Sequence, residues 1–175
     1  ARNAGIRSSG GEYILPLDAD DRITPRYMAE AVKVLDENAD IKIVYCNAER
    51  FGDRTGPWEH PPFSMRQILI NNVIFCTAFF RRRDYDLTEG YDKTLRFQED
   101  WDFWLSLLES GGKVHKLAGT YFFYRFREDS MLQTINARAF EQMYARIYRK
   151  HLRLYAGHFF DPVNLYHEKT QLETS

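Results

Sequence analysis

Three carboxylates directly follow a short apolar run near the start of this chain. The run is EYILPL at residues 12–17, and the acids are Asp18, Asp20 and Asp21. Like charges this close repel one another, and an ionised carboxylate is costly wherever water is partly excluded. Hard oxygen ligands beyond a strand end suit Mg²⁺ or Mn²⁺, which often bridge to substrate phosphates. The pattern indicates either a divalent cation carrying a nucleotide diphosphate or aspartates that cap backbone amides in a turn.

A second acidic pair, Glu99 and Asp100, opens the segment EDWDFWLSLLESGG. Apolar residues recur there at helical spacing, so we expect an amphipathic helix with Asp100 in its first turn. The helix N-terminus favours an ionised carboxylate, and such a group at the mouth of a pocket can act as a general base. Asp102 lies about 200° further around the helix, so it cannot share that site. The alternative is that Glu99 and Asp100 only stabilise the start of the helix.

The elements around these acids predict an α/β sheet. Apolar runs at 12–17 and 41–46 are typical of buried strands, the first of them parallel. Thr24-Pro25 marks the start of a helix that runs to about residue 38 and buries Met28, Val32 and Leu35. The remaining pattern predicts a helix near 64–71, a strand at 75–81, two strands (KVHKL and TYFFYRF) joined at Ala118-Gly119, and loops at 47–62 and 86–98.

From about residue 136 the pattern is helical to the end. Phe140, Met143, Tyr144 and Ile147 fall on one face. Two interpretations stay open: the segment packs on the domain or on a second copy, or it forms a basic amphipathic helix on an anionic membrane. We expect packing, because acidic Glu141 and Asp161 flank the basic stretch.

Composition limits the function classes. The chain has 175 residues, with 24 Lys and Arg against 25 Asp and Glu, so its net charge of −1 does not favour nucleic acid as a partner. The basic run RRRD at 81–84 is expected to be a solvated turn. Cys46 and Cys76 are predicted to be buried thiols of a reducing compartment. No apolar stretch approaches the roughly 20 residues needed to cross a bilayer. We expect a cytoplasmic protein, with peripheral binding to the inner face of the cell membrane left open.

Three segments, in order, resemble family 2 glycosyltransferases of the GT-A fold. They are ARNAGIRSSGGEYILPLDADD, FCTAFFRRRDYDLTEGYDKTLRFQEDWDFWLSLLESGGKV and FFYRFREDSM. The resemblance covers residues 1 to about 131 and implies a Rossmann-related mixed sheet flanked by helices, followed by a helical extension at 132–175. Such enzymes normally open with a strand, a helix and a second strand that hold the nucleoside. That section is absent here, so we expect a GT-A domain truncated at its N-terminus.

The resemblance also implies roles for individual residues. Asp18 and Asp20 would be the D-x-D pair that contacts the nucleotide and a Mn²⁺ or Mg²⁺ ion, and Asp100 would be the catalytic base. Arg125 and Arg127 belong to a strand and loop expected to close over the sugar-diphosphate, although either arginine could instead be exposed on a strand edge. The expected contacts to the nucleotide-sugar, with a UDP-sugar favoured, are Arg2, Asn3, Asp18, Asp20, Asp21, Glu99, Arg125 and Arg127.

The implied reaction is metal-dependent, inverting transfer of a sugar to an acceptor hydroxyl. The acceptor would be a glycan or a lipid-linked molecule, in the synthesis of bacterial cell-surface polysaccharide or glycoconjugate. Trp58 and Tyr91 are candidates to stack on a sugar ring. The rival hypothesis is a non-catalytic remnant that binds carbohydrate or a partner and dimerises to cover exposed sheet. A metal-dependent phosphotransferase is disfavoured, because no Gly-rich phosphate loop with a Lys is present.

Overall fold

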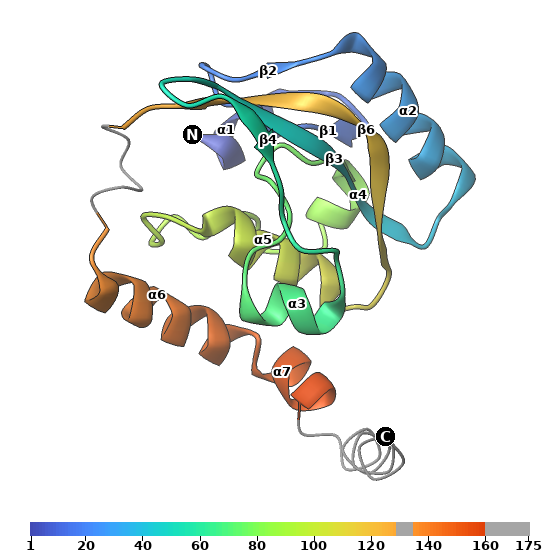
Figure 1. Ribbon diagram of the computed structural model, residues 1–175. Helices are drawn as coiled ribbons and strands as arrows, with labels where there is room; N and C mark the ends of the chain where they lie inside the picture. The colour runs from blue at the N-terminus through green and yellow to red at the C-terminus, as the bar shows by residue number, and fades with distance from the viewer. Residues whose placement is uncertain (129–134, 160–175) are drawn as a thin grey trace, which may run out of the picture.

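Two long strands, β3 (Ile41–Gly52) and β6 (Lys113–Phe126), run parallel through the centre of the fold. In the computed structural model, which describes residues 1–128 and 135–159, two short strands complete this sheet. They are β2 (Arg22–Ile23), antiparallel to β6, and β4 (Gly56–Trp58), antiparallel to β3. The resulting order is β2-β6-β3-β4 (Figure 1). The predicted mixed sheet is therefore confirmed.

The strand expected at 12–17 is much shorter than predicted and is not parallel. Only β1 (Tyr13–Ile14) has strand geometry, and it pairs antiparallel with β5 (Phe80–Arg81) in a separate small sheet. Pro16 has no N–H to donate to a sheet, and Leu17 is 44% exposed. A bridge between Val44 and Phe79 links this small sheet to β3.

Helices lie on both sides of the main sheet. α2 (Pro25–Glu37) packs on β3 and β6, whereas α5 (Glu99–Leu108) contacts β3 from the other side (Figure 1). The predicted start and length of α2 are correct and Leu35 is buried as predicted, but Tyr27 and Ala31 are buried in place of Met28 and Val32. Tyr27 and its i+4 and i+8 neighbours are buried, whereas Met28 is 48% exposed. The buried Tyr27 keeps its hydroxyl hydrogen-bonded, because that hydroxyl donates to the Thr77 carbonyl at 2.9 Å.

The two long strands, β3 and β6, extend through segments that were expected to be irregular. β3 continues through the first six residues of the predicted loop at 47–62. The predicted break at Ala118-Gly119 is instead a bulge inside one continuous β6, because the register shifts between the pairs Tyr45↔Lys116 and Asn47↔Thr120. Asn47 stabilises the bulge by donating from its side chain to the Ala118 carbonyl at 2.7 Å.

The basic run at 81–84 is not a solvated turn. Arg81 is 2% exposed and Asp84 is 5% exposed. The Arg81 guanidinium donates to carbonyls that follow α2, at 2.9 Å from Asn38 and 2.6 Å from Ile41, and also to Leu35. Leu35 lies in the last turn of α2 and Asn38 is its C-cap residue, so Arg81 of β5, which directly precedes the short helix α4 (Arg82–Tyr85), caps the end of α2.

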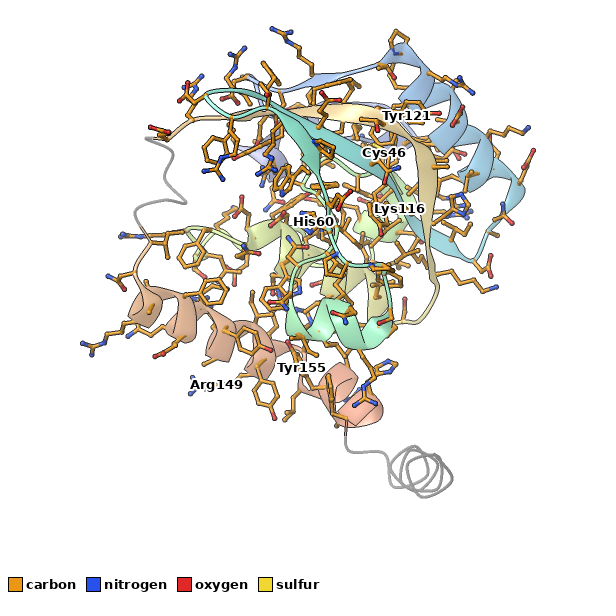
Figure 2. The ribbon with its side chains drawn as sticks, in the orientation of Figure 1. Cys46, His60, Lys116, Tyr121, Arg149 and Tyr155 are labelled. Atoms are coloured by element: carbon orange, nitrogen blue, oxygen red, sulfur yellow. The ribbon has the colours of Figure 1, made fainter. Side chains whose placement is uncertain are left out.

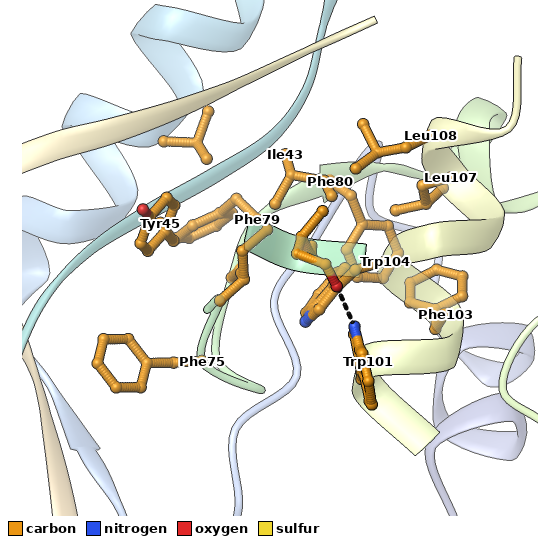
Figure 3. Packing of buried hydrophobic residues seen from close by; sticks show 14 of the residues in the cluster. Ile43, Tyr45, Phe75, Phe79, Phe80, Trp101, Phe103, Trp104, Leu107 and Leu108 are labelled. Atoms are coloured by element: carbon orange, nitrogen blue, oxygen red, sulfur yellow. Dashed lines mark hydrogen bonds between the residues drawn. The ribbon is translucent and has the colours of Figure 1, made fainter. Parts of the chain in front are cut away.

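Aromatic side chains of α5 fill the core. Trp101, Phe103 and Trp104 are at most 1% exposed, and the rings of Phe80 and Phe103 meet edge to face at 4.9 Å (Figure 3). The Trp101 indole donates to the Ile68 carbonyl of α3 (Met65–Ile70) at 2.6 Å. These contacts fix the orientation of α5 and therefore the position of Asp100 at its first turn.

The helical C-terminal segment packs on the domain, as predicted. It forms α6 (Ala137–Lys150) and α7 (Leu152–Phe159), with a break at His151. Asp102, which is fully buried, binds Lys150 at 2.6 Å and the His151 ring at 2.9 Å. The other ring nitrogen of His151 lies 2.7 Å from Glu109. Phe140 remains 42% exposed, unlike Met143 and Ile147 on the same helix.

Some predictions fall outside the described residues. The boundary between 131 and 132 lies there, as do Asp161 and the last predicted helical residues. Among the helices that the structure describes, none is long and apolar enough to cross a membrane.

Removing the buried Asp102 carboxylate should release the C-terminal helices. Asp102→Ala leaves the charge of Lys150 and the His151 ring without their shared partner, and breaking a buried ion pair in this way typically costs about 3–5 kcal/mol. Urea unfolding should show a loss of this size, accompanied by faster proteolysis in α6. The exposed Glu89→Ala is the control and should change stability by no more than about 0.5 kcal/mol. Equal stability of the two variants would contradict the assignment.

Candidate active site

The Arg2 side chain joins the two acidic motifs. Arg2 belongs to α1 (Arg2–Ser8), a helix that the sequence pattern did not predict. One guanidinium nitrogen lies 3.0 Å from Asp18, and the other pairs with Glu99. Burial alone would lower the pKa of Arg2, but the charges of Asp18 and Glu99 raise it above its usual range. Asp18 and the two acids at the start of α5 therefore line one cleft.

Asp21 is the most buried of the first three acids. Its Oδ1 accepts a hydrogen bond from the Arg125 backbone at 2.8 Å, whereas its buried Oδ2 has no partner. Burial raises the pKa of Asp21 to about 6, with contributions from the charges of Asp18 and Asp20, and the hydrogen bond from Arg125 opposes this shift. A buried carboxylate oxygen without a partner is rare in folded proteins and indicates a missing proton, water or cation.

Ligand atoms of Asp18, Asp21 and Cys76 lie within 4.8 Å of one another. The two carboxylates fit Mg²⁺ or Mn²⁺, and the orphaned Oδ2 of Asp21 is an oxygen that such an ion would satisfy. Burial raises the pKa of the Cys76 thiol to about 12, and the nearby Asp100 and Asp18 charges contribute. A neutral thiol is a poor ligand for hard cations, so the carboxylates are the metal-binding candidates.

Asp20 faces away from this group. Its carboxylate lies 3.2 Å from the guanidinium of Arg127, and its backbone carbonyl accepts from Arg125 at 3.2 Å. The structure therefore brings Asp18 together with Asp21, whereas the D-x-D pattern predicts the pair Asp18 and Asp20. That pair stays a prediction. Arg125 and Arg127 do lie beside the first acidic motif, although Arg127 is largely exposed.

Asp100 lies at the first turn of α5, where the sequence placed it. Its Oδ2 accepts from the Asn72 side chain at 3.1 Å, and its Oδ1 accepts from the Trp101 backbone at 2.9 Å. Burial raises the pKa of Asp100 to about 6, helped by the Glu99 charge and opposed by Arg2. Asn72 was missed by sequence reasoning, since an amide in a loop carries no local signal of this contact.

Two of the cavities that border Arg2 and Asp18 also reach the acids of α5. The first, of about 620 Å³, is bordered by Glu99 and by the loop at 91–96. The second, of about 240 Å³, contains Asp100 and is walled by Trp58 of β4 and His60. We call this second cavity the Asp100 cleft.

Tyr91 does not stand free to stack on a sugar. It is 5% exposed and stacks on Phe103 at 4.3 Å, so that prediction is wrong. The Asn3 amide is also occupied: it donates to the Tyr91 carbonyl at 2.8 Å and accepts from the Tyr91 N–H at 2.9 Å. Asn3 thus positions the loop at 86–98, and its contact with a nucleotide stays a prediction.

Comparison with known proteins decides the family. The model of glycosyl transferase family 2 matches residues 1–100, which is more than half of the chain. The chain belongs to this family. An uncharacterized glycosyltransferase from Haemophilus influenzae is 32% identical over 117 residues, covering 62% of this chain and 40% of that protein. The succinoglycan biosynthesis protein ExoO from Rhizobium meliloti is 25% identical over 162 residues, covering 83% of this chain and 47% of that protein.

The structural comparison agrees on the fold. S. aureus TarS residues 1–349, crystallised with UDP-GlcNAc, matches with a TM-score of 0.59 at 17% identity, covering 90% of this chain and 52% of that one. The family 2 chain therefore has the GT-A fold. It spans about half or less of the length of these relatives.

The raised pKa of Asp21 makes stability depend on pH in a definite direction. The folded state holds the proton more tightly than the ordinary carboxyl of pKa 3.8, so stability contributed by protonated Asp21 is lost as pH rises through about 6. In Asp21→Asn that loss disappears. With metal chelated, urea unfolding should show the variant gaining roughly 1–2 kcal/mol over the native chain between about pH 4 and 7. A difference that does not change with pH would contradict this.

Proposed function

We propose that this family 2 chain carries the metal-binding and base-bearing part of an inverting glycosyltransferase. It would move a sugar from a nucleotide-sugar, with a UDP-sugar favoured, to a hydroxyl of a glycan or lipid-linked acceptor. One observation carries the proposal: Asp18 lines the same cleft as Asp100, with Arg2 between the two motifs, and Asp21 lies beside Asp18 with its ligand atom within 4.8 Å. The UDP-GlcNAc bound to the TarS structure supports the choice of donor class.

Asp100 is the proposed general base. Above its pKa of about 6 it is ionised, and Asn72 and the Trp101 N–H hold its two oxygens in place. The acceptor hydroxyl attacks the anomeric carbon from the face opposite the diphosphate and gives its proton to Asp100. A new bond from the anomeric carbon to the acceptor oxygen forms as the bond to the diphosphate oxygen breaks. The configuration at that carbon is inverted.

The residues around Asp18 would offset the negative charge of the donor diphosphate, through a bound cation and through Arg2. When bound, a Mn²⁺ or Mg²⁺ ion supplies positive charge that offsets the charge developing on the leaving diphosphate. Asp18 and Asp21 are the residues that would hold it, with Asp20 as the alternative ligand from the sequence pattern. Arg2 adds a fixed cation at the same edge of the cleft.

The setting of the reaction is part of the same proposal. The names of relatives include a succinoglycan biosynthesis protein and an E. coli chondroitin synthase, which support a role in making bacterial cell-surface polysaccharide or glycoconjugate. The two free thiols, Cys46 and Cys76, support a reducing compartment such as the cytoplasm.

Metal and nucleotide should bind together. Calorimetry should show that Mn²⁺ and UDP each bind weakly alone and more tightly in the presence of the other, because the cation screens Asp18 and Asp21 from the diphosphate. Asp18→Ala should reduce the coupled affinity by about tenfold or more. Comparing Asp20→Ala with Asp21→Asn identifies the second ligand. Tight binding of Mn²⁺ alone, unchanged in Asp18→Ala, would contradict the proposal.

Asp100→Asn should separate catalysis from folding. The variant keeps its shape and one of the two hydrogen bonds, because an amide has a single acceptor oxygen. It should stay folded and bind UDP and Mn²⁺, yet lose about 10²–10⁴-fold in transfer rate from a panel of UDP-sugars. In the native enzyme kcat/KM should rise with pH and level off above about 6, because the base must be ionised.

The matched control for this variant is the exposed Asp86→Asn. Asp102 cannot serve as the control, because its buried carboxylate binds Lys150 and His151. Full activity in Asp100→Asn would mean that another group is the base.

A further inference from the structure

Gln98, two residues before the proposed base, has an unusual backbone conformation. It is the N-cap of α5 with φ 58° and ψ 23°, and among the described residues it is the non-glycine residue with positive φ. Glycine adopts this left-handed conformation without steric penalty, whereas side chains with a Cβ rarely do. A strained residue at this place suggests that its side chain has a use in the cleft.

The side chain of Gln98 ends in an unsatisfied polar atom. Its Oε1 is buried without a hydrogen-bond partner, and the same holds for Nε2 of His60. Both residues line the Asp100 cleft. Because buried polar atoms are nearly always paired, two orphans in one small cleft point to a ligand that supplies their partners. Burial lowers the pKa of His60, with the Asn72 backbone acting the other way, so the ring is neutral.

The rest of the cleft wall is aromatic. Trp58 packs against Tyr124 at 4.4 Å and against His60 at 5.4 Å, and the His60 ring meets Phe75 edge to face at 4.4 Å. Figure 2 shows His60 between the main sheet and α5. A wall of rings with a few uncharged polar atoms matches a sugar ring, which has an apolar C–H face and an edge of hydroxyls.

The charges of the cleft argue against an acceptor that carries phosphate. Among the described residues lining it, Arg2 is the one cation, and its guanidinium already pairs with Asp18 and Glu99. The carboxylates of Asp18, Glu99 and Asp100 would repel a further anion there. The volume of about 240 Å³ is smaller than a typical drug-sized site and suits a single ring.

We propose that Gln98 and His60, with Trp58 as the apolar wall, form an acceptor subsite that binds a neutral sugar ring and presents its hydroxyl to Asp100. The inference rests on the proposed function and narrows it: the acceptor is a glycan end. Gln98 accepts a hydrogen bond from one sugar hydroxyl, and neutral His60 pairs with a second one. The strained turn at the start of α5 lets the Gln98 amide and the Asp100 carboxylate contact the same acceptor sugar.

Ligand-observed NMR on the chain tests this subsite. Methyl glycosides of glucose, galactose and N-acetylglucosamine are titrated, and saturation transfer to their ring protons is followed. At least one should bind, and Gln98→Gly should weaken it by about tenfold while melting no lower than the native chain, because glycine relieves the strain. His60→Phe, which keeps a ring, should weaken the same sugar. The exposed Gln67→Ala on α3 is the matched control and should leave binding unchanged.

Either of two NMR results would overturn the subsite: no saturation transfer to any glycoside, or equal transfer in Gln98→Gly and the native chain. In the active enzyme, Gln98→Gly should raise KM for the acceptor without changing KM for the UDP-sugar; a rise confined to the UDP-sugar would also overturn it. The proposed function fails separately, through absent coupling of UDP with Mn²⁺ or an active Asp100→Asn. Sugar binding that depends on Gln98 can therefore be established even where transfer is not found.

Discussion

The ion pairs of Arg2 are the interaction on which the site depends. Asp18, Glu99 and Asp100 line one cleft from segments far apart in the sequence, and Asp21 lies beside Asp18. A partly dry cleft gives the repulsion of these carboxylates little screening. Arg2 stands between the two motifs and neutralises part of this charge. Burial is the main cause of the raised pKa values of Asp21 and Asp100, and the charges of neighbouring carboxylates add to both shifts. The site is thus poised to accept more positive charge.

The elements that carry the charged cleft are fixed in place because their other side chains are buried in the hydrophobic core. α5 presents Asp100 to the cleft from its first turn and inserts Trp101, Phe103 and Trp104 into the core from the same helix. The parallel pairing of β3 and β6 runs beneath both motifs and carries Arg125, whose backbone N–H holds Asp21. Because these elements are packed on rigid neighbours, the separation of metal candidates and base does not rely on loop conformation alone.

Two amide side chains restrict groups that border the cleft. Asn72 fixes the carboxylate of Asp100, and Asn3 fastens the loop at 86–98 through the Tyr91 backbone. Both amides are uncharged, and each restricts the position of a group that borders the proposed reaction centre: Asn72 restricts the Asp100 carboxylate, and Asn3 restricts the loop. The C-terminal helices act similarly at longer range, since Lys150 and His151 hold Asp102 on the opposite face of α5.

The sequence by itself determined the α/β class, the start of α2 at Thr24-Pro25, the start of α5 and the packing face around Met143 and Ile147, because periodicity and helix caps are local properties of the chain. Tertiary structure alone decided that β6 is one bulged strand, that Arg81 caps α2 and that Asp21 rather than Asp20 lies beside Asp18. It also decided that Gln98 and His60 meet in one cleft. Each of these depends on which partner lies opposite a residue, and the spacing of residues along the chain does not encode that.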